Sequence, residues 1–301
     1  MNKQINRFRF LSFLCAAVVF FLLSGCGGRL QRTPTESPTS TALPPTPTPT
    51  EAPMALRVNG EGIRLEDFNE EMQRYQAALK ELGRSEDESD SRNRVLQNLV
   101  DETLLAQAAV REGFMMDDEA YRQRLAALVE KAGGEETFQK WMSVNAYTSE
   151  NLERALRRAA AAAWMRDRIA ETVPERTEQV HAQQILLYDE VQANGISTRL
   201  KSGTEFATIA WQIDPLTGGE LGWFPRGYLT QPAVEQAAFN MQPGEISDVI
   251  PSEIGYHIIT VIEREPDHLL SPDARQTLQR IALMSWMEQA RSEATIENLL
   301  P

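Results

Sequence analysis

The fold is decided by the stretch Gly218-Gly219-Glu220-Leu221-Gly222-Trp223-Phe224-Pro225-Arg226-Gly227. Three further stretches follow it, Glu235-Gln236-Ala237-Ala238-Phe239, Pro243-Gly244-Glu245-Ile246-Ser247 and Gly255-Tyr256-His257-Ile258-Ile259. Their order indicates a glycine-bracketed loop, a short helix, a turn and an apolar strand that carries one histidine. A lone GGxLG stretch is a weak signal, whereas four linked motifs within about forty residues form a specific one.

In this order, the motifs resemble the signature of parvulin-type peptidyl-prolyl isomerases. The resemblance implies a small domain of sheet and helices that catalyses rotation about X-Pro peptide bonds. Such rotation crosses a barrier of ~18–20 kcal/mol without breaking a covalent bond, so no strong nucleophile is required. The site instead needs an apolar cup for the proline ring and polar groups that favour the twisted amide over the planar one. No cofactor is expected.

The resemblance also assigns residues to the cup and to a polar network beside it. The residues expected to bind the substrate are Leu221, Leu229, Val234 and Phe239. The network of the family contains two histidines; His257 matches the second, whereas the first aligns with Gln184. His181 does not replace it, because it lies three residues away and an odd separation in a strand places side chains on opposite faces.

Asp214 is the candidate for the acidic position of this network, and the catalytic set is therefore His257, Asp214 and Gln184. The spacer between Asp214 and Gly218 is shorter than is usual in the family, and Val234 is smaller than the usual Phe or Met. We therefore expect catalysis to be weak or lost. The alternative is that His257 is a buried structural residue whose hydrogen-bond partner is Gln184.

The first residues of the chain have the pattern of a signal peptide. Three basic residues precede an apolar stretch over residues 10–23, which is too short and ends too abruptly to favour a membrane-spanning helix. Leu23-Ser24-Gly25-Cys26 resembles a bacterial lipobox, which implies that residues 1–25 are removed and that Cys26 carries a lipid. The alternative is an uncleaved membrane anchor. Both place the body of the chain outside the cytoplasm, at the membrane.

Composition limits what lies beyond the signal. Residues 29–53 are almost entirely Thr, Pro, Ser and Glu, which predicts an extended linker. The formal net charge is -13 at pH 7, so nucleic acid and anionic lipid headgroups would repel the surface and membrane contact has to rest on the anchor. The charge indicates solubility; the alternative is that it recruits basic clients. Of the 2 cysteines, Cys15 lies in the signal, so the mature chain has no intramolecular disulfide.

Helical periodicity dominates the region between the linker and the isomerase motifs. After a short strand and turn at 55–60, apolar residues recur every three or four positions over 65–79, 96–108, 117–129, 138–142 and 149–169. We expect Asp117 and either Thr148 or Ser149 to start helices, and Trp141 and Trp164 to pack in the core. Ser271 starts a last helix, whose apolar surface requires a partner among the amino-terminal helices.

Strand-like patterns begin after Pro174. We expect strands at 181–187, 246–250 and 257–262, a helix capped by Thr204, and another whose first turn contains Pro232. The expected fold class is α+β, with a mostly helical domain that resembles the SurA-like chaperone domain and an inserted small sheet domain that resembles parvulin. The expected division is a signal peptide at 1–25, the lipidated cysteine and linker at 26–53, a helical domain at 54–175, the parvulin-like domain at 176–265, and a carboxyl-terminal helix at 266–301.

This arrangement resembles the SurA and PrsA type of extracytoplasmic chaperone-isomerases. The resemblance implies a lipid-anchored foldase that binds unfolded secreted polypeptides and isomerises their X-Pro bonds. One alternative is a chaperone whose parvulin-like domain binds peptides without catalysis, which Gln184 and Val234 favour. Another is a solute-binding lipoprotein, which would require two α/β lobes. The three histidines, His181, His257 and His268, lack metal-ligand spacing, and no P-loop, Rossmann or Ser-His-Asp pattern occurs.

Overall fold

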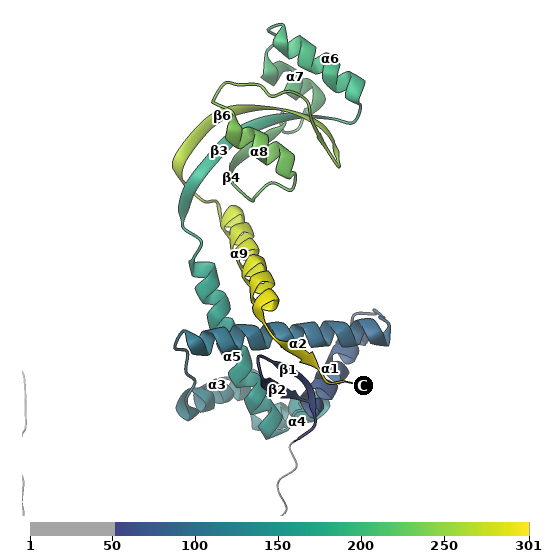
Figure 1. The fold of residues 1–301 in the computed structure, drawn as a ribbon, viewed down its shortest axis with the longest axis vertical. Helices are drawn as coiled ribbons and strands as arrows, with labels where there is room; N and C mark the ends of the chain where they lie inside the picture. Colours follow the sequence, from purple (N-terminus) through teal and green to yellow (C-terminus); the bar gives the residue numbers. More distant parts are fainter. Residues whose placement is uncertain (1–51, 301) are drawn as a thin grey trace, which may run out of the picture. The chain divides into compact units, whose positions relative to one another are not determined.

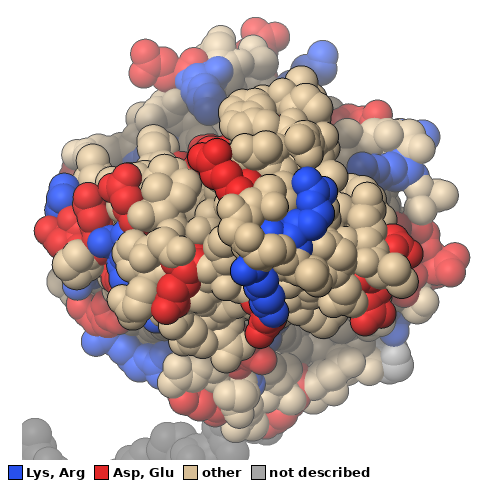
Figure 2. All heavy atoms as spheres, turned by 90° about the horizontal axis from the view of Figure 1, so that it is seen from above, with Lys and Arg blue, Asp and Glu red and all other residues tan. Residues whose placement is uncertain are grey.

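The structure is a computed structural model that describes residues 52–300 (Figure 1). The predicted signal peptide, Cys26 and nearly all of the predicted linker lie outside the described residues. Among the described helices, none is both long enough and apolar enough to cross a membrane. On the face drawn in Figure 2, acidic and basic side chains are interspersed with uncharged ones.

A hairpin followed by helices forms the first part of the described chain. Its elements are β1 (Met54–Val58), β2 (Glu61–Arg64), α1 (Leu65–Glu81), α2 (Glu88–Arg111), α3 (Asp118–Lys131), α4 (Glu135–Val144) and α5 (Ser149–Glu171). The hairpin turns at Asn59 and Gly60, whose φ angles of 52° and 84° suit a type I′ turn. Every helix expected from periodicity in this region is present.

Side-chain caps fix where three of the helices begin. The Asp117 carboxylate accepts a hydrogen bond from the Ala120 N–H at 2.8 Å, and the Ser271 hydroxyl accepts one from the Ala274 N–H at 3.1 Å. Thr148 and Asn151 form a reciprocal capping box, which identifies Thr148 rather than Ser149 as the N-cap of α5. Local chemistry of the chain therefore sets these starts, as the sequence predicted.

The last helix, α9 (Pro272–Glu293), shares one core with the amino-terminal helices. Buried residues of that core come from both ends of the chain and include Phe68, Leu99, Leu104, Met165, Ile169 and Met287. Strand β7 (Ile296–Asn298), which the sequence did not predict, pairs with β1 and completes a sheet of order β2-β1-β7 (Figure 1). Trp164 packs against the same core, whereas Trp141 remains 44% exposed and stacks on Phe138 and Tyr147.

A four-stranded antiparallel sheet forms the second part. It consists of β3 (Arg176–Leu187), β4 (Glu220–Pro225), β5 (Ile250–Ser252) and β6 (Gly255–Leu269), in the order β4-β3-β6-β5. Helices α6 (Glu190–Lys201) and α7 (Phe206–Ile213) supply the core on one face, and α8 (Pro232–Asn240) supplies it on the other. Because side chains alternate along a strand, Ile185 and Ile258 pack with α6 and α7, whereas Ala182, Ile259 and Val261 pack with α8.

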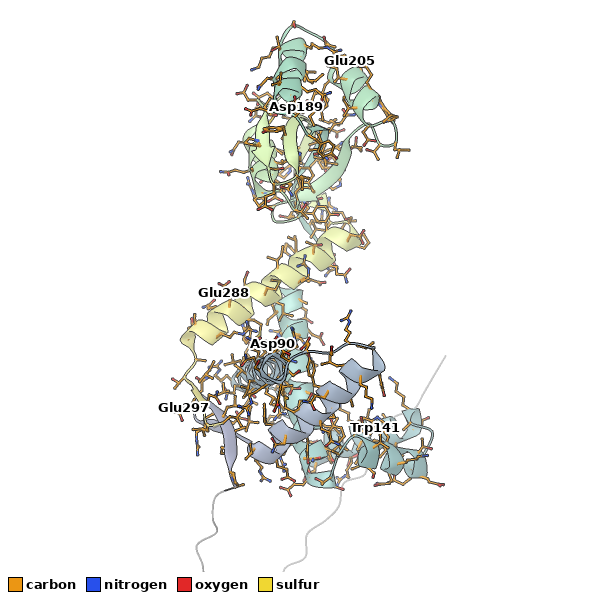
Figure 3. All side chains as sticks on the ribbon, turned by 90° about the vertical axis from the view of Figure 1, so that its right-hand side faces the viewer. Asp90, Trp141, Asp189, Glu205, Glu288 and Glu297 are labelled. Atoms are coloured by element: carbon orange, nitrogen blue, oxygen red, sulfur yellow. The ribbon has the colours of Figure 1, made fainter. Side chains whose placement is uncertain are left out.

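Two elements of this domain were missed in the sequence. Helix α6 begins after Asp189, labelled in Figure 3, whose carboxylate accepts a hydrogen bond from the Gln192 N–H at 2.7 Å. Gly195 and the polar residues around it weaken the helical pattern there. Strand β4 lies within the stretch expected to be a loop, and its pairing with β3 shifts register at Ala182 and Gln183, next to its glycines.

Two other expectations for this domain were wrong in detail. The N-cap of α7 is Glu205, also labelled in Figure 3, rather than Thr204. The strand expected at 246–250 begins only at Ile250, and Ile246 makes an isolated bridge to Thr260. The Ser247 N–H donates to the Ile259 carbonyl at 2.9 Å, but the Ile259 N–H donates to the Ser247 hydroxyl oxygen, also at 2.9 Å, so a side chain supplies one of the two acceptors at this point.

Candidate active site

His257 lies at the centre of a polar network in the middle of the sheet. Its side chain is almost fully buried, with 1% of the residue exposed. Its Nδ1 atom lies 3.0 Å from the Gln184 Oε1 atom, and its Nε2 atom lies 2.8 Å from the Ser252 hydroxyl oxygen. Register explains the contact with Gln184, because His257 pairs with Leu186 and Gln184 is two residues away on the same face.

Burial determines the protonation state of this imidazole. Desolvation lowers the pKa of His257 below its ordinary value, so the ring is neutral at neutral pH. The Gln184 amide is oriented with its oxygen toward the His257 Nδ1 atom. Because an amide oxygen only accepts hydrogen bonds, the proton of the neutral ring is on Nδ1. The other nitrogen, Nε2, then accepts a hydrogen bond from Ser252. His257 is therefore a neutral ring that orients the amide of Gln184.

The structure brings the four expected cup residues together in one apolar cluster on the α8 face of the sheet. Val234 and Phe239 are 2% and 3% exposed, whereas Leu221 and Leu229 are partly buried and pack against the cluster. The Phe239 ring packs edge-to-face against Phe224. The Arg226 guanidinium lies over the Phe239 ring, with its Cζ atom 4.1 Å from the ring centroid. The two leucines therefore retain surface that a proline ring can contact, and the two buried residues support them.

Asp214 lies at the carboxyl-terminal end of α7, and its side chain makes its described hydrogen bonds within the loop that follows. Its carboxylate accepts hydrogen bonds from the backbone N–H groups of Leu216 and Thr217, at 3.0 and 3.2 Å, and from the Thr217 hydroxyl. These bonds lower the pKa of Asp214, so it is ionised. Within the described residues, its hydrogen bonds go to its own loop, and none reaches His257. Asp214 therefore shapes the loop.

That loop is tied to Gln184 through its backbone. The Thr217 hydroxyl oxygen accepts a hydrogen bond from the Gly219 N–H at 3.1 Å, and the Gly219 carbonyl accepts one from the Gln184 N–H at 2.8 Å. A Cβ atom at Gly219 would lie 1.8 Å from the Gln184 carbonyl oxygen, and the φ angle of Gly219 is +74°. Only glycine allows this close approach.

Ser252 is a site residue that the sequence did not indicate. It pairs with Gly255 in the tight turn between β5 and β6, and this turn brings its hydroxyl to His257. The motif that carries His257 begins at Gly255, so Ser252 falls just outside it. Counting the register of a β5–β6 hairpin would have found it.

The two remaining histidines lie apart from this network. His181 and His268 both stack on Trp223, and their ring centroids lie 5.4 and 4.1 Å from that of Trp223. The His181 Nε2 atom lies 2.5 Å from a Glu220 carboxylate oxygen. His181 pairs across the sheet with Trp223 and Glu263, on the face opposite to that of Gln184. Across residues 52–300, no group of three or more His, Cys, Asp or Glu side chains could hold a metal ion.

Two family models match the chain. The model described as a SurA-like N-terminal domain matches residues 1–166, and that of the PPIC-type PPIase domain matches residues 169–263. These matches divide the chain close to the start of β3, where the described structure changes from helices to sheet.

Similar proteins carry names of folding factors. The chain is 32% identical over 126 residues to the foldase protein PrsA of Geobacillus sp. (strain WCH70), which spans 40% of this chain and 45% of the relative. It is 27% identical over 201 residues to the foldase protein PrsA of Oceanobacillus iheyensis, and this match covers 64% of each chain. It is 32% identical over 148 residues to the chaperone SurA of Nitrosospira multiformis, and this match covers 42% of this chain and 33% of the relative. Each match thus spans less than two thirds of the relative's own length.

A crystal structure of peptidylprolyl isomerase PrsA from Bacillus cereus is also similar, with a TM-score of 0.46 and 23% sequence identity. The alignment covers 80% of this chain and 90% of that one.

Proposed function

Since the chain belongs to the family with a SurA-like N-terminal domain and carries a PPIC-type peptidyl-prolyl isomerase domain, we propose that it isomerises X-Pro bonds in unfolded secreted polypeptides. One observation carries the proposal: the buried His257 network lies on the same sheet face as the apolar cluster that contains Leu221 and Leu229. This provides an apolar surface for the proline ring beside polar groups for the amide.

The hydrogen bonds of the network assign a role to each polar residue. Gln184 Oε1 is occupied by His257, and no described residue accepts a hydrogen bond from the Gln184 amide nitrogen. Those N–H groups are free to donate to the carbonyl oxygen of the residue before proline. As the X-Pro bond twists, the amide loses its resonance, and a donor held in place favours that state without reorganising. His257 and Ser252 hold the donor in position.

The apolar residues supply the second contribution. Leu221 and Leu229 contact the proline ring, while Val234 and Phe239 support them from within the core. Contact with apolar side chains removes water from the ring and its amide, which strengthens the hydrogen bond from Gln184. Asp214 acts on this site through the loop that it stabilises.

We further propose that the helical part binds the client chain. It comprises residues 54–175 and the carboxyl-terminal helix within 266–301, and the isomerase domain at 176–265 is inserted between them. A cleft of about 960 Å³ in the helical part is lined by Leu104, Val110 and Trp286 together with charged side chains. Such a mixed lining suits extended chains of varied sequence.

The place of action follows from the amino-terminal sequence. A signal with a lipobox at Cys26 supports a lipoprotein at the outer surface of the cytoplasmic membrane, with the Pro- and Thr-rich segment as spacer. Mass spectrometry of the membrane-extracted protein should find a lipidated Cys26 at the mature amino terminus. An intact signal in the wild type would contradict this proposal.

A refolding experiment tests the isomerase and chaperone proposals together. The full chain, in mild detergent, is added in catalytic amount to an unfolded protein whose refolding is limited by X-Pro isomerisation. We expect faster refolding and less aggregation. Suppressed aggregation without faster refolding would identify the chain as a peptide-binding chaperone, and no effect on either would refute both proposals.

A further inference from the structure

One carboxylate binds three consecutive backbone N–H groups beside the cup. Glu235 Oε1 accepts a hydrogen bond from the Gly227 N–H at 2.7 Å, and Oε2 accepts from Tyr228 and Leu229, both at 2.9 Å. The φ angle of Gly227 is +84°, in the left-handed region. When neighbouring residues alternate between the left-handed and the right-handed backbone conformation, their N–H groups point to the same side and form a concave anion-binding site. Here the anion is supplied by the chain itself.

The segment held in this way carries one wall of the cup. Leu229 packs against the apolar cluster that also contains Val234, and Glu235 follows Val234 directly on α8. Tyr228 packs against the same cluster and also against a second one formed by Val173, Leu270 and Ala274. The Glu235 carboxylate therefore joins the loop wall of the cup to the helix wall.

The hydrogen bonds of Glu235 serve the loop rather than the helix. A first-turn acid on a helix commonly stabilises that helix through its own N–H groups or its dipole. The described acceptor contacts of the Glu235 carboxylate all come from residues 227–229. Each bond has an ionised acceptor, and such bonds are shorter and stronger than neutral ones.

We propose that Glu235 is a positioning residue of the isomerase site, which sets the distance between Leu229 and Val234 and so the fit of the cup around the proline ring. This inference rests on the proposed function. Glu235 touches no substrate and transfers no proton. It acts through the position of Leu229.

Replacement by glutamine tests the geometry at constant side-chain length. A glutamine keeps one acceptor oxygen but places an NH₂ group where the second oxygen was. The backbone N–H groups that bonded to that second oxygen then face a donor and lose their acceptor. Glu245→Gln is the matched control, because Glu245 also accepts a backbone bond, from the Gln242 N–H at 2.7 Å, in a loop of the same domain outside the cup.

The measurement is the binding of two matched short peptides, one Ala-Pro and one Ala-Ala, to the full chain in mild detergent, with thermal melts of each variant. We expect Glu235→Gln to raise the Kd of the Ala-Pro peptide at least fivefold and to reduce the preference for it over the Ala-Ala peptide. Glu245→Gln should stay within twofold of the wild type. If Glu235→Gln melts below the assay temperature, Glu235→Asp takes its place, since it retains the charge but loses the reach.

A double-mutant cycle separates positioning from a general loss of stability. If Glu235 acts through Leu229, then Leu229→Ala combined with Glu235→Gln should lose less affinity than the two single losses multiplied together. Equal affinities in Glu235→Gln, Glu245→Gln and the wild type would overturn the inference while leaving the proposed function intact. Independent losses in the cycle would also overturn it. A wild type that binds no prolyl peptide would overturn the inference and the proposed function together.

Discussion

Replacing Gln184 by methionine should lower isomerase turnover while the domain remains folded. The Gln184 side chain accepts a hydrogen bond from His257 Nδ1 at 3.0 Å and is the proposed donor to the substrate carbonyl. Methionine has a similar length and a flexible thioether that fills the same space, but it has no donor. The substitution therefore removes the donor and leaves the shape.

The expected changes in turnover and in stability follow from two hydrogen bonds of Gln184, the proposed one to the substrate carbonyl and the one from His257 Nδ1. One hydrogen bond contributes about 0.5–1.5 kcal/mol net, and 1.36 kcal/mol in a barrier is tenfold in rate, so turnover should fall roughly 2- to 13-fold. The same change leaves the His257 Nδ1–H without its acceptor in a residue that is 1% exposed. That loss should cost about 1–3 kcal/mol of stability.

The assay follows cis-to-trans conversion in a short Ala-Pro peptide, with melts to verify that each variant is folded. Gln139→Met is the control for loss of a glutamine hydrogen bond and should keep wild-type turnover, because Gln139 lies on α4, outside the sheet domain, and donates its amide hydrogen bond to the Glu135 carboxylate at 2.7 Å. Turnover in a folded Gln184→Met variant equal to that of the wild type would refute the donor role.

Three further predictions concern stability. Burial lowers the pKa of His257 in the folded state, so as the pH falls below about 6.5 the unfolded chain takes up a proton before the folded chain does. The free energy of unfolding, measured by urea titration, should therefore fall by up to about 1.4 kcal/mol per pH unit until the pH passes the lower folded-state pKa. The fall should be less steep in His257→Asn. Equal slopes would contradict this. Gly219→Ala should prevent stable folding of the sheet domain, because the new Cβ atom would lie 1.8 Å from a β3 carbonyl oxygen. Gly222→Ala should lower the free energy of unfolding in thermal melts by only about 1–2 kcal/mol, because the space around Gly222 is open and only its φ angle of +68° disfavours alanine. Similar melts for both would contradict the close approach. Met287→Ala, 8% exposed, should cost about 2–5 kcal/mol, while Met284→Ala, 60% exposed, should stay within about 0.5 kcal/mol; equal losses would show that α9 is not packed through Met287.

Features that depend on neighbouring residues could be predicted from the sequence. Asp117 and Ser271 start helices because their side chains bond to N–H groups three residues later. The alternation around His257 placed it in a strand, and the three-residue offset placed His181 on the other face of the sheet. These arguments need no knowledge of the rest of the fold.

Features that depend on distant pairing could not be predicted. Strand β7 exists because Ile296–Asn298 pairs with β1, about 240 residues earlier in the chain. Strand β4 has a glycine-rich sequence typical of loops, and only the adjacent edge of β3 makes it a strand. Tertiary contacts outweighed local propensity in both cases.

The candidate site divides along the same line. The family motif located His257, Gln184 and the apolar residues, because these positions have a fixed spacing. Asp214 was proposed for the acidic position of the family's network, and its carboxylate accepts hydrogen bonds from the N–H groups of Leu216 and Thr217 in its own loop. Ser252 and Glu235 act through contacts that only the folded backbone brings about.

The central claim is that the His257 network and the cup catalyse rotation of an X-Pro bond. Exchange NMR of an Ala-Pro peptide at equilibrium measures this directly, because it reads interconversion of the cis and trans forms without any coupled reaction. Uncatalysed exchange takes tens to hundreds of seconds. With a small amount of the folded full chain, we predict exchange faster than the uncatalysed rate, at the low turnover that Gln184 and Val234 imply, and loss of this acceleration in a folded His257→Ala variant. Exchange at the uncatalysed rate with folded wild-type protein would contradict the claim.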